Sequence, residues 1–237
     1  MNREYHKWYS SALGRDMEML VFGHAGLPLL VFPTTRGRFF EYEDGGMTAA
    51  IAGQIDNGQV QLFCVDSVDA ESWYNRGTHP RYRVQRHLQY ERYIVDDVLP
   101  LIRQRNGQWG RLLTTGCSFG GFHAVNFAFR HPDLFAGAVS MGGAFDIHDF
   151  LGGYWDDDCY FNNAPDYLAG MSDPWYLDRY RNMRIVLAAG EWDICLDANL
   201  KLSGVLHGKG VPHWLDIWGN HTKHDWPYWR DMARKYF

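Results

Sequence analysis

The stretch Gly116-Cys117-Ser118-Phe119-Gly120 spells the pattern G-x-S-x-G and decides the fold prediction. A short apolar run, 111–115, precedes it, and apolar residues at helical spacing follow over 122–129. A strand, a sharp turn and a helix in this order form the context of a nucleophile elbow, in which a strained turn lifts the serine hydroxyl clear of the sheet. Glycines flank the serine because side chains at those positions would collide with the neighbouring strand and helix. We therefore predict that Ser118 is a nucleophile.

Short apolar runs alternate with segments of helical periodicity along the rest of the chain. Most runs are rich in Val, Leu and Ile, which is typical of strands in a parallel sheet covered by helices on both faces. The alternation predicts a doubly wound, mostly parallel α/β fold, formed as a single domain over residues 1–237. Pro100 is expected to kink the first long helix or to end its regular part. The expected strands are 17–22, 29–32, 60–65, 112–115, 137–141, 185–189 and 213–218, and the expected helices are 84–102, 122–129, 198–206 and 226–237.

The segment 152–182 breaks this alternation and carries several aromatic and acidic residues without clean periodicity. An insertion of this length in a compact domain is often a lid or a binding loop. Because Trp73, Tyr74 and Trp155 follow the ends of predicted strands, we predict that they line a substrate pocket. The acidic run 156–158 would discourage anionic substrates if it faced that pocket.

The composition is that of a globular protein. Hydrophobic residues make up 46% and charged residues 22% of the 237 residues, which is ordinary for a globular protein. A formal net charge of −5 argues against nucleic acid as a partner. The N-terminal residues contain no apolar signal region, and no stretch is long enough to span a membrane, so we expect a cytoplasmic protein. Oligomerisation can be neither predicted nor excluded from the sequence.

A serine nucleophile needs a base within hydrogen-bond reach and a carboxylate that orients the base. In α/β-hydrolases these groups follow in the order serine, acid, histidine. The segment Gly190-Glu191-Trp192-Asp193 follows the predicted strand 185–189, and we predict that Asp193 is the acid because the preceding residues allow the chain to turn. Glu191 and Asp197 remain alternatives.

The base is one of two histidines that follow the strand 213–218. His224 lies immediately before the last predicted helix, and His221 lies three residues earlier in the same loop. The pair could also suggest a metal site, but no further ligands stand at a recognisable spacing, and the four cysteines are scattered, so we expect no metal.

The oxyanion of an acyl-transfer intermediate needs two hydrogen-bond donors. One is expected to be the backbone N–H of Phe119, the residue after the nucleophile. The other is expected from the loop 33–37 after an early strand, where Thr35 has the most suitable position. Backbone donors do not depend on side-chain type, so the sequence carries little signal for this second donor.

The chain resembles the putative-esterase family of α/β-hydrolases, which includes esterase D (S-formylglutathione hydrolase) and the mycolyltransferases. The resemblance implies an α/β-hydrolase fold, Ser118 as nucleophile, Asp193 as acid, His224 as base and the Thr35 and Phe119 amides as oxyanion donors. It also implies hydrolysis of esters or thioesters without a cofactor. The segments that carry it are 116–121, 190–193 and 224–229.

The chain departs from that family at two places: Pro33-Thr34 stands where a His-Gly pair is common, and Cys117 stands where His or Tyr is common. Three functions therefore remain to be distinguished. The first is a serine esterase acting on a small-molecule ester, the second is an acyltransferase in which an alcohol replaces water, and the third is a non-catalytic binding module.

Overall fold

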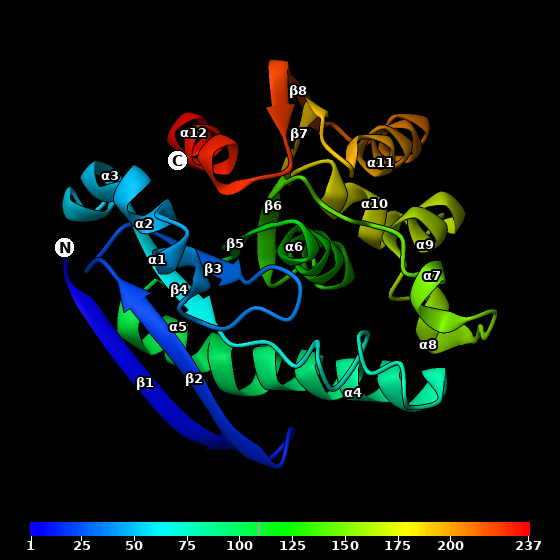
Figure 1. Ribbon diagram of the computed structural model, residues 1–237, viewed down its shortest axis with the longest axis horizontal. Helices are drawn as coiled ribbons and strands as arrows, with labels where there is room; N and C mark the ends of the chain where they lie inside the picture. The colour runs from blue at the N-terminus through cyan, green and yellow to red at the C-terminus, as the bar shows by residue number, and fades with distance from the viewer. Residues whose placement is uncertain (109) are drawn as a thin grey trace.

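In the computed structural model, residues 1–108 and 110–237 are described, and their strands form one eight-stranded sheet in the order β1-β2-β4-β3-β5-β6-β7-β8 (Figure 1). The pairs β1/β2 and β2/β4 are antiparallel, and the remaining pairs are parallel. The strands are β1 (Arg3–Ser10), β2 (Arg15–Phe22), β3 (Leu27–Phe32), β4 (Val60–Val65), β5 (Leu112–Cys117), β6 (Phe135–Met141), β7 (Arg184–Trp192) and β8 (Trp214–Lys223).

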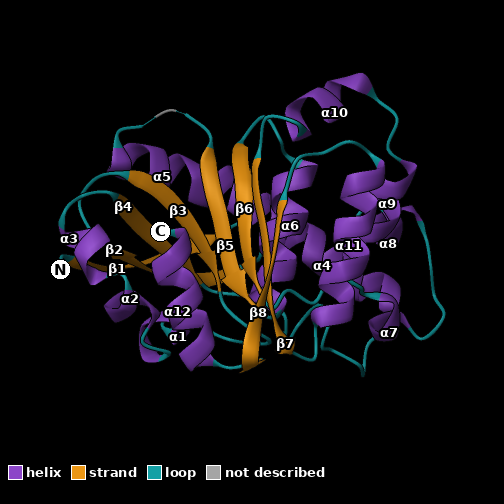
Figure 2. Cartoon of the chain, turned by 90° about the horizontal axis from the view of Figure 1, so that it is seen from above, coloured by secondary structure: helices purple, strands orange, loops and turns teal. Residues whose placement is uncertain are grey.

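Helices cover both faces of the sheet because successive strand residues point to opposite sides and both sides are apolar (Figure 2). In β3, Leu30 packs into the core under one helical layer, and Leu29 and Val31 pack into the core under the other. None of the described helices is long and apolar enough to cross a membrane. The first layer contains α4 (Pro80–Arg92), the π-helical segment η1 (Tyr93–Val98), α5 (Leu99–Asn106), α6 (Phe119–Arg130) and α11 (Leu196–Gly208), and the second contains α1 (Glu41–Asp44), α2 (Met47–Ala50), α3 (Ala52–Asp56) and α12 (Trp226–Tyr236).

This architecture confirms the predicted mostly parallel α/β fold. Each predicted strand overlaps an observed one, but β1 was not predicted. Its sequence, REYHKWYS, contains no apolar run, because β1 is an edge strand and most of its side chains are wholly or partly exposed. Hydrophobic periodicity cannot identify a strand of this kind.

The first long helix differs from the prediction in its middle. It begins at Pro80, and its regular α-helical part ends at Arg92, where the π-helical segment η1 begins. Pro100 occupies the second position of α5, directly after η1. A proline has no amide hydrogen for the carbonyl four residues earlier, and the hydrogen-bond pattern before it is i→i+5 instead of i→i+4.

The segment 152–182 is partly helical, and only part of it is buried. It contains α8 (Asp157–Tyr160), α9 (Ala164–Gly170) and α10 (Pro174–Tyr180), which follow α7 (His148–Leu151). Tyr167, Leu168 and Tyr180 are buried in the same core cluster as the apolar side chains of α6. The segment is therefore an insertion that is anchored in the core through α9 and Tyr180 and exposed over residues 172–175, and its role as a lid stays a prediction.

Candidate active site

Ser118 joins β5 to α6 in a conformation that few non-glycine residues adopt. Its φ is 54° and its ψ is −122°, and its N–H donates to the Met141 carbonyl over 3.0 Å. Such a conformation costs on the order of 1–3 kcal/mol and persists only where the surroundings hold it. A Cβ on Gly116 would lie 2.4 Å from the Gly120 backbone, and a Cβ on Gly120 would lie 2.4 Å from the Phe32 carbonyl oxygen. The glycines on either side of the serine are therefore needed for the close approach of β5, α6 and the end of β3.

The structure brings Ser118, His224 and Asp193 into one hydrogen-bonded chain. His224 Nε2 lies 2.9 Å from Ser118 Oγ, and His224 Nδ1 lies 2.7 Å from Asp193 Oδ1. A carboxylate can only accept, so Nδ1 carries the ring proton of a neutral imidazole, and Nε2 is left to accept from the serine hydroxyl. The Asp193 side chain is fully buried, and the His224 side chain is 15% exposed. The buried carboxylate thus orients the imidazole, and part of the His224 side chain remains exposed to solvent, from which a substrate would arrive.

Asp193 is held by the turn that follows β7. Its N–H donates to the Gly190 carbonyl over 3.1 Å, and its Oδ1 accepts from the Cys195 N–H over 2.7 Å. Next to it lies Gly142, which directly follows β6 and has φ of 63°. A Cβ there would lie 2.7 Å from Asp193 Oδ2 and 2.9 Å from His224 Nδ1. The carboxyl ends of four adjacent parallel strands therefore shape the site, as expected for open α/β sheets.

Substituting Gly142 with alanine should misalign the acid and the base. We expect kcat to fall by at least about 10²-fold, because displacements near 1 Å in such sites have effects of this size. The matched control is Gly152→Ala, since Gly152 also has a positive φ, 56°, but a Cβ there meets no atom within 4 Å. Both variants carry the same kind of backbone strain. Ester hydrolysis at equal rates in the two variants would contradict the predicted steric role of Gly142.

The alternative acids and base lie elsewhere. The Glu191 carboxylate accepts the backbone N–H of His221, and Asp197 is exposed in the first turn of α11. His221 is exposed, has φ of 60°, and its ring contacts Trp192 at 4.0 Å between centroids. The hydrogen bond to Ser118 Oγ is made by His224.

Asp193, Cys195 and His224 also form a group of potential metal ligands, whose ligand atoms lie within 4.8 Å of one another. Burial, followed by the charge of Asp193, raises the pKa of the Cys195 thiol to about 12. The thiol therefore stays protonated near neutral pH, whereas metals bind the thiolate. In addition, Asp193 Oδ1 and His224 Nδ1 already bond to each other, so this donor set fits an acid–base pair better than a metal site.

Thr35 and Phe119 lie at the same end of the sheet. Gly120, near the start of α6, lies close to the Phe32 carbonyl at the end of β3. The loop 33–37 directly follows β3. In that loop the Glu41 carboxylate accepts from both the N–H and the hydroxyl of Thr34, each over 2.7 Å. In the described part of the chain, neither the Thr35 nor the Phe119 N–H donates to a protein acceptor. Both donors are therefore available to a ligand.

The three predicted pocket residues have different environments. Tyr74 is half-buried, its hydroxyl lies 3.0 Å from Thr35 Oγ1, and its ring lies 5.3 Å from that of Phe119. Trp155 stacks on His148 at 4.1 Å, outside the apolar cluster around Phe119.

The prediction for Trp73 is wrong. Its side chain is fully buried and packs against His87 and Phe122, so it cannot line a pocket. Phe150 was not predicted, and its ring contacts both Tyr74 and Phe119, at 4.8 and 5.4 Å between centroids. Phe150 is distant from both in sequence, and no local pattern marks it.

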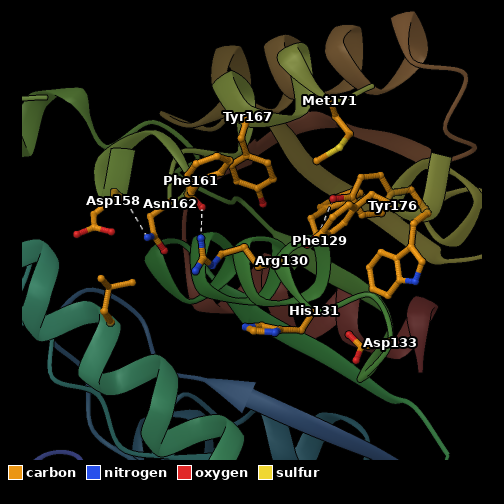
Figure 3. Close-up of a pocket in the computed structure, with 13 residues that line it drawn as sticks. Phe129, Arg130, His131, Asp133, Asp158, Phe161, Asn162, Tyr167, Met171 and Tyr176 are labelled. Atoms are coloured by element: carbon orange, nitrogen blue, oxygen red, sulfur yellow. Dashed lines mark hydrogen bonds between the residues drawn. The ribbon is translucent and has the colours of Figure 1, made fainter. Parts of the chain in front are cut away.

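A cavity of about 490 Å³ is lined by residues at the C-terminal end of α6 (Figure 3), whereas Ser118 precedes the first residue of that helix. Its walls include Phe129 and Arg130 from the end of α6, with Tyr167 and Tyr176 from α9 and α10. Because α6 has 12 residues and is about 18 Å long, this cavity is separate from the serine. Asp158 lines this cavity, and the Asp156 side chain caps α8. The prediction that the acidic run 156–158 discourages anionic substrates at Ser118 therefore has no structural basis.

The comparisons with known proteins agree with this geometry. A family model described as Putative esterase matches residues 10–236. The chain belongs to the Putative esterase family. The resemblance stated from the sequence is thereby confirmed, and this family member is a hydrolase that acts on ester bonds. No curated protein sequence matches it significantly.

Solved structures of esterases share the fold. A ferulic acid esterase has a TM-score of 0.80 at 17% identity, with 99% of this chain and 96% of that chain covered. An S-formylglutathione hydrolase from Agrobacterium tumefaciens has a TM-score of 0.74 at 14% identity, with 98% and 92% covered. A fluorophosphonate-binding serine hydrolase from Staphylococcus aureus has a TM-score of 0.65 at 18% identity, with 99% and 96% covered. At these identities the similarity establishes the α/β-hydrolase fold and leaves the substrate open.

Proposed function

We propose that this esterase is a serine carboxylesterase that hydrolyses ester or thioester bonds through an acyl-enzyme on Ser118. The observation that carries the proposal is the hydrogen-bonded chain Ser118–His224–Asp193 at a strained turn. A serine hydroxyl alone is a weak nucleophile, and an adjacent oriented imidazole is what activates it.

In the first half-reaction, Ser118 Oγ attacks the acyl carbonyl and His224 Nε2 takes the hydroxyl proton. The buried Asp193 carboxylate holds the imidazole in the required tautomer and stabilises the imidazolium. The Thr35 and Phe119 amides donate to the oxyanion of the tetrahedral intermediate, and one such donor is worth roughly 3–4 kcal/mol. His224 then gives its proton to the leaving alcohol or thiol.

In the second half-reaction, water attacks the acyl-enzyme, and His224 acts again as base and then as acid. The product is a carboxylic acid, and no step requires a cofactor or a metal. Tyr74, beside the two oxyanion donors, forms the wall of the acyl site in this proposal, and Trp155 forms an outer rim.

We further propose a single domain that works in the cytoplasm, without a nucleic-acid partner. The net charge of −5 disfavours binding to phosphate backbones. All four cysteines are free thiols, which supports a reducing compartment.

Turnover of p-nitrophenyl esters and of a thioester by the purified protein tests the proposed reaction. We expect a burst of p-nitrophenol in proportion to enzyme, followed by steady hydrolysis, as for an acyl-enzyme. Adding a primary alcohol separates the two catalytic candidates, because an acyltransferase forms the new ester and a hydrolase forms the free acid. A rate no higher than the uncatalysed background for every substrate would refute the proposal and favour a binding module.

A further inference from the structure

Next to the proposed nucleophile, the partly exposed rings of Tyr74 and Phe150 form an aromatic wall that packs on the buried ring of Phe119. Phe119 follows Ser118 directly, Tyr74 contacts it at 5.3 Å between ring centroids, and Phe150 contacts both rings. The Tyr74 hydroxyl bonds to Thr35, which ties this wall to the proposed oxyanion site. Burial raises the pKa of Tyr74 above its ordinary value, so the wall carries no negative charge near neutral pH.

Two arginines lie against the exposed side of this aromatic wall. Arg36 Cζ is 5.6 Å from the Tyr74 ring centroid, and Arg76 Cζ is 5.9 Å from the Phe150 ring centroid. Contacts of this kind contribute about 0.5–1 kcal/mol at exposed sites, and they position a guanidinium without neutralising it. Two parts of the chain that are far apart in sequence therefore present positive charge to the same surface.

Neither arginine forms an ion pair within the described residues. In residues 1–108 and 110–237, no carboxylate oxygen lies within 4.0 Å of the Arg36 or Arg76 guanidinium. Arg38, two residues further along the same loop, instead pairs with Glu18 and Asp66 at 2.5 and 2.7 Å. The planar donor groups of Arg36 and Arg76 are thus free to form bidentate hydrogen bonds with a ligand carboxylate.

A third arginine, Arg83, lies close enough to Arg76 to be affected by its charge. Arg83 is only 5% exposed, and its guanidinium donates to the Trp73 carbonyl. Burial lowers the pKa of Arg83, and the positive charge of Arg76 lowers it further. Its Nε is buried without a hydrogen-bond partner. Arg83 therefore adds to the positive potential around Arg76, and an anion bound there would relieve the repulsion between these two arginines.

The backbone at Arg36 is also unusual. Its φ is 55°, in the left-handed region that disfavours residues with long side chains. Such a conformation costs on the order of 1 kcal/mol and tends to persist where it positions a functional group. It directly follows Thr35, so the strained turn places the Arg36 side chain next to the proposed oxyanion donor.

We propose that Arg36 and Arg76 form an anion subsite, and that the enzyme prefers esters that carry a carboxylate a few atoms from the scissile carbonyl. This inference rests on the proposed function, because it specifies the substrate class of the same site. The carboxylate could belong to the acyl group or to the leaving alcohol, and it would bind to the guanidinium groups over the partly exposed rings of Tyr74 and Phe150, which pack on the buried Phe119. It would also be steered towards the site from solution.

The experiment compares charged and neutral esters in matched pairs. On the acyl side, p-nitrophenyl hemiglutarate is compared with its methyl ester, p-nitrophenyl methyl glutarate. On the leaving-group side, 4-acetoxybenzoate is compared with methyl 4-acetoxybenzoate. We expect kcat/KM for the charged member of at least one pair to exceed that of the neutral member by about tenfold, equivalent to about 1.4 kcal/mol. The pair that shows the preference identifies which end of the ester carries the anion.

The variants Arg36→Gln and Arg76→Gln test the residues. Each should lower kcat/KM for the preferred charged ester by about 5- to 20-fold, mainly through KM, and leave the neutral ester within about twofold, as expected for loss of a charged hydrogen bond used in binding. The control is Arg92→Gln, an exposed arginine at the end of α4 that removes the same charge outside the aromatic wall. Salt at 0.5 M should reduce the preference in the wild type, because exposed charges are screened.

Equal kcat/KM for both members of both pairs would overturn the anion subsite, as would an effect of Arg92→Gln equal to that of Arg36→Gln and Arg76→Gln. Turnover of the neutral esters separates this failure from failure of the proposed reaction. An enzyme that hydrolyses neutral esters through Ser118 and ignores charge refutes only the subsite. An enzyme that hydrolyses none of the four esters refutes both.

Discussion

Replacement of Ser118 by alanine is expected to lower kcat for ester hydrolysis by at least about 10³-fold and to leave the melting temperature close to that of the wild type. The serine hydroxyl bonds to His224 Nε2, and its oxygen is the only non-hydrogen atom that the substitution removes. The glycine contacts that shape the turn involve backbone atoms, which alanine retains. The fold should therefore survive while the nucleophile is lost.

Steady-state kinetics together with thermal unfolding of the purified variant measure both effects. Ser118→Thr is a useful companion, because it keeps a hydroxyl but adds a methyl group at a strained position. If Ser118→Ala keeps more than a tenth of the wild-type activity, an effect below about 1.4 kcal/mol, another group must be the nucleophile.

The second large effect is expected at the base and the acid. His224→Ala should match Ser118→Ala in its loss of kcat, because members of a triad act as a unit. Asp193→Asn should lower kcat on the order of 10⁴-fold, since an amide in place of the carboxylate favours the wrong imidazole tautomer. Both expectations follow from the two hydrogen bonds of His224, at 2.9 and 2.7 Å.

Matched controls come from neighbouring residues of the same type. His221→Ala and Asp197→Asn should change kcat by less than about threefold, because surface substitutions of this kind have small effects. His221 and Asp197 are both exposed. If His221→Ala were inactive and His224→Ala active, the base would be His221. If Asp197→Asn were inactive and Asp193→Asn active, the acid would be Asp197.

The elbow could be predicted from sequence because its information is local. Five consecutive residues with a strand before them and a helix after them specify the turn, and Gly116 and Gly120 have the close contacts that their residue type implied. The order of serine, acid and histidine could be predicted as well, because each follows a separate apolar run. Long-range geometry was not needed for either.

The choice between His221 and His224 could not be made from the residues themselves. Both follow the same apolar run, and the structure separates them by an irregularity in β8. Asn220 and His221 have positive φ, and the pairing of β8 with β7 shifts register after Gly190, where a Cβ would lie 2.1 Å from the Thr222 carbonyl oxygen. Because of this bend, the His221 ring contacts Trp192, and His224, three residues later, reaches Ser118. The helix that follows, α12, begins at Trp226, and the Asp225 side chain caps it.

The substrate site was predicted least well. Trp73 and Tyr74 are adjacent in a loop without periodicity, so no pattern could indicate that the first is buried and the second borders the site. Arg36, Arg76 and Phe150 come from three separate loops or helix ends, and only the folded chain brings their side chains to one surface. Such sites depend on tertiary contacts, which hydrophobic patterning does not encode.

Covalent labelling with a fluorophosphonate probe tests the central claim, an activated serine at position 118, most directly. We expect the wild-type protein to gain the mass of one probe adduct, tandem mass spectrometry to locate it on Ser118, and His224→Ala to label far more slowly. Ser118→Ala should gain no adduct under the same conditions. A folded wild-type protein that remains unlabelled, or that carries the adduct on another residue, would contradict the account.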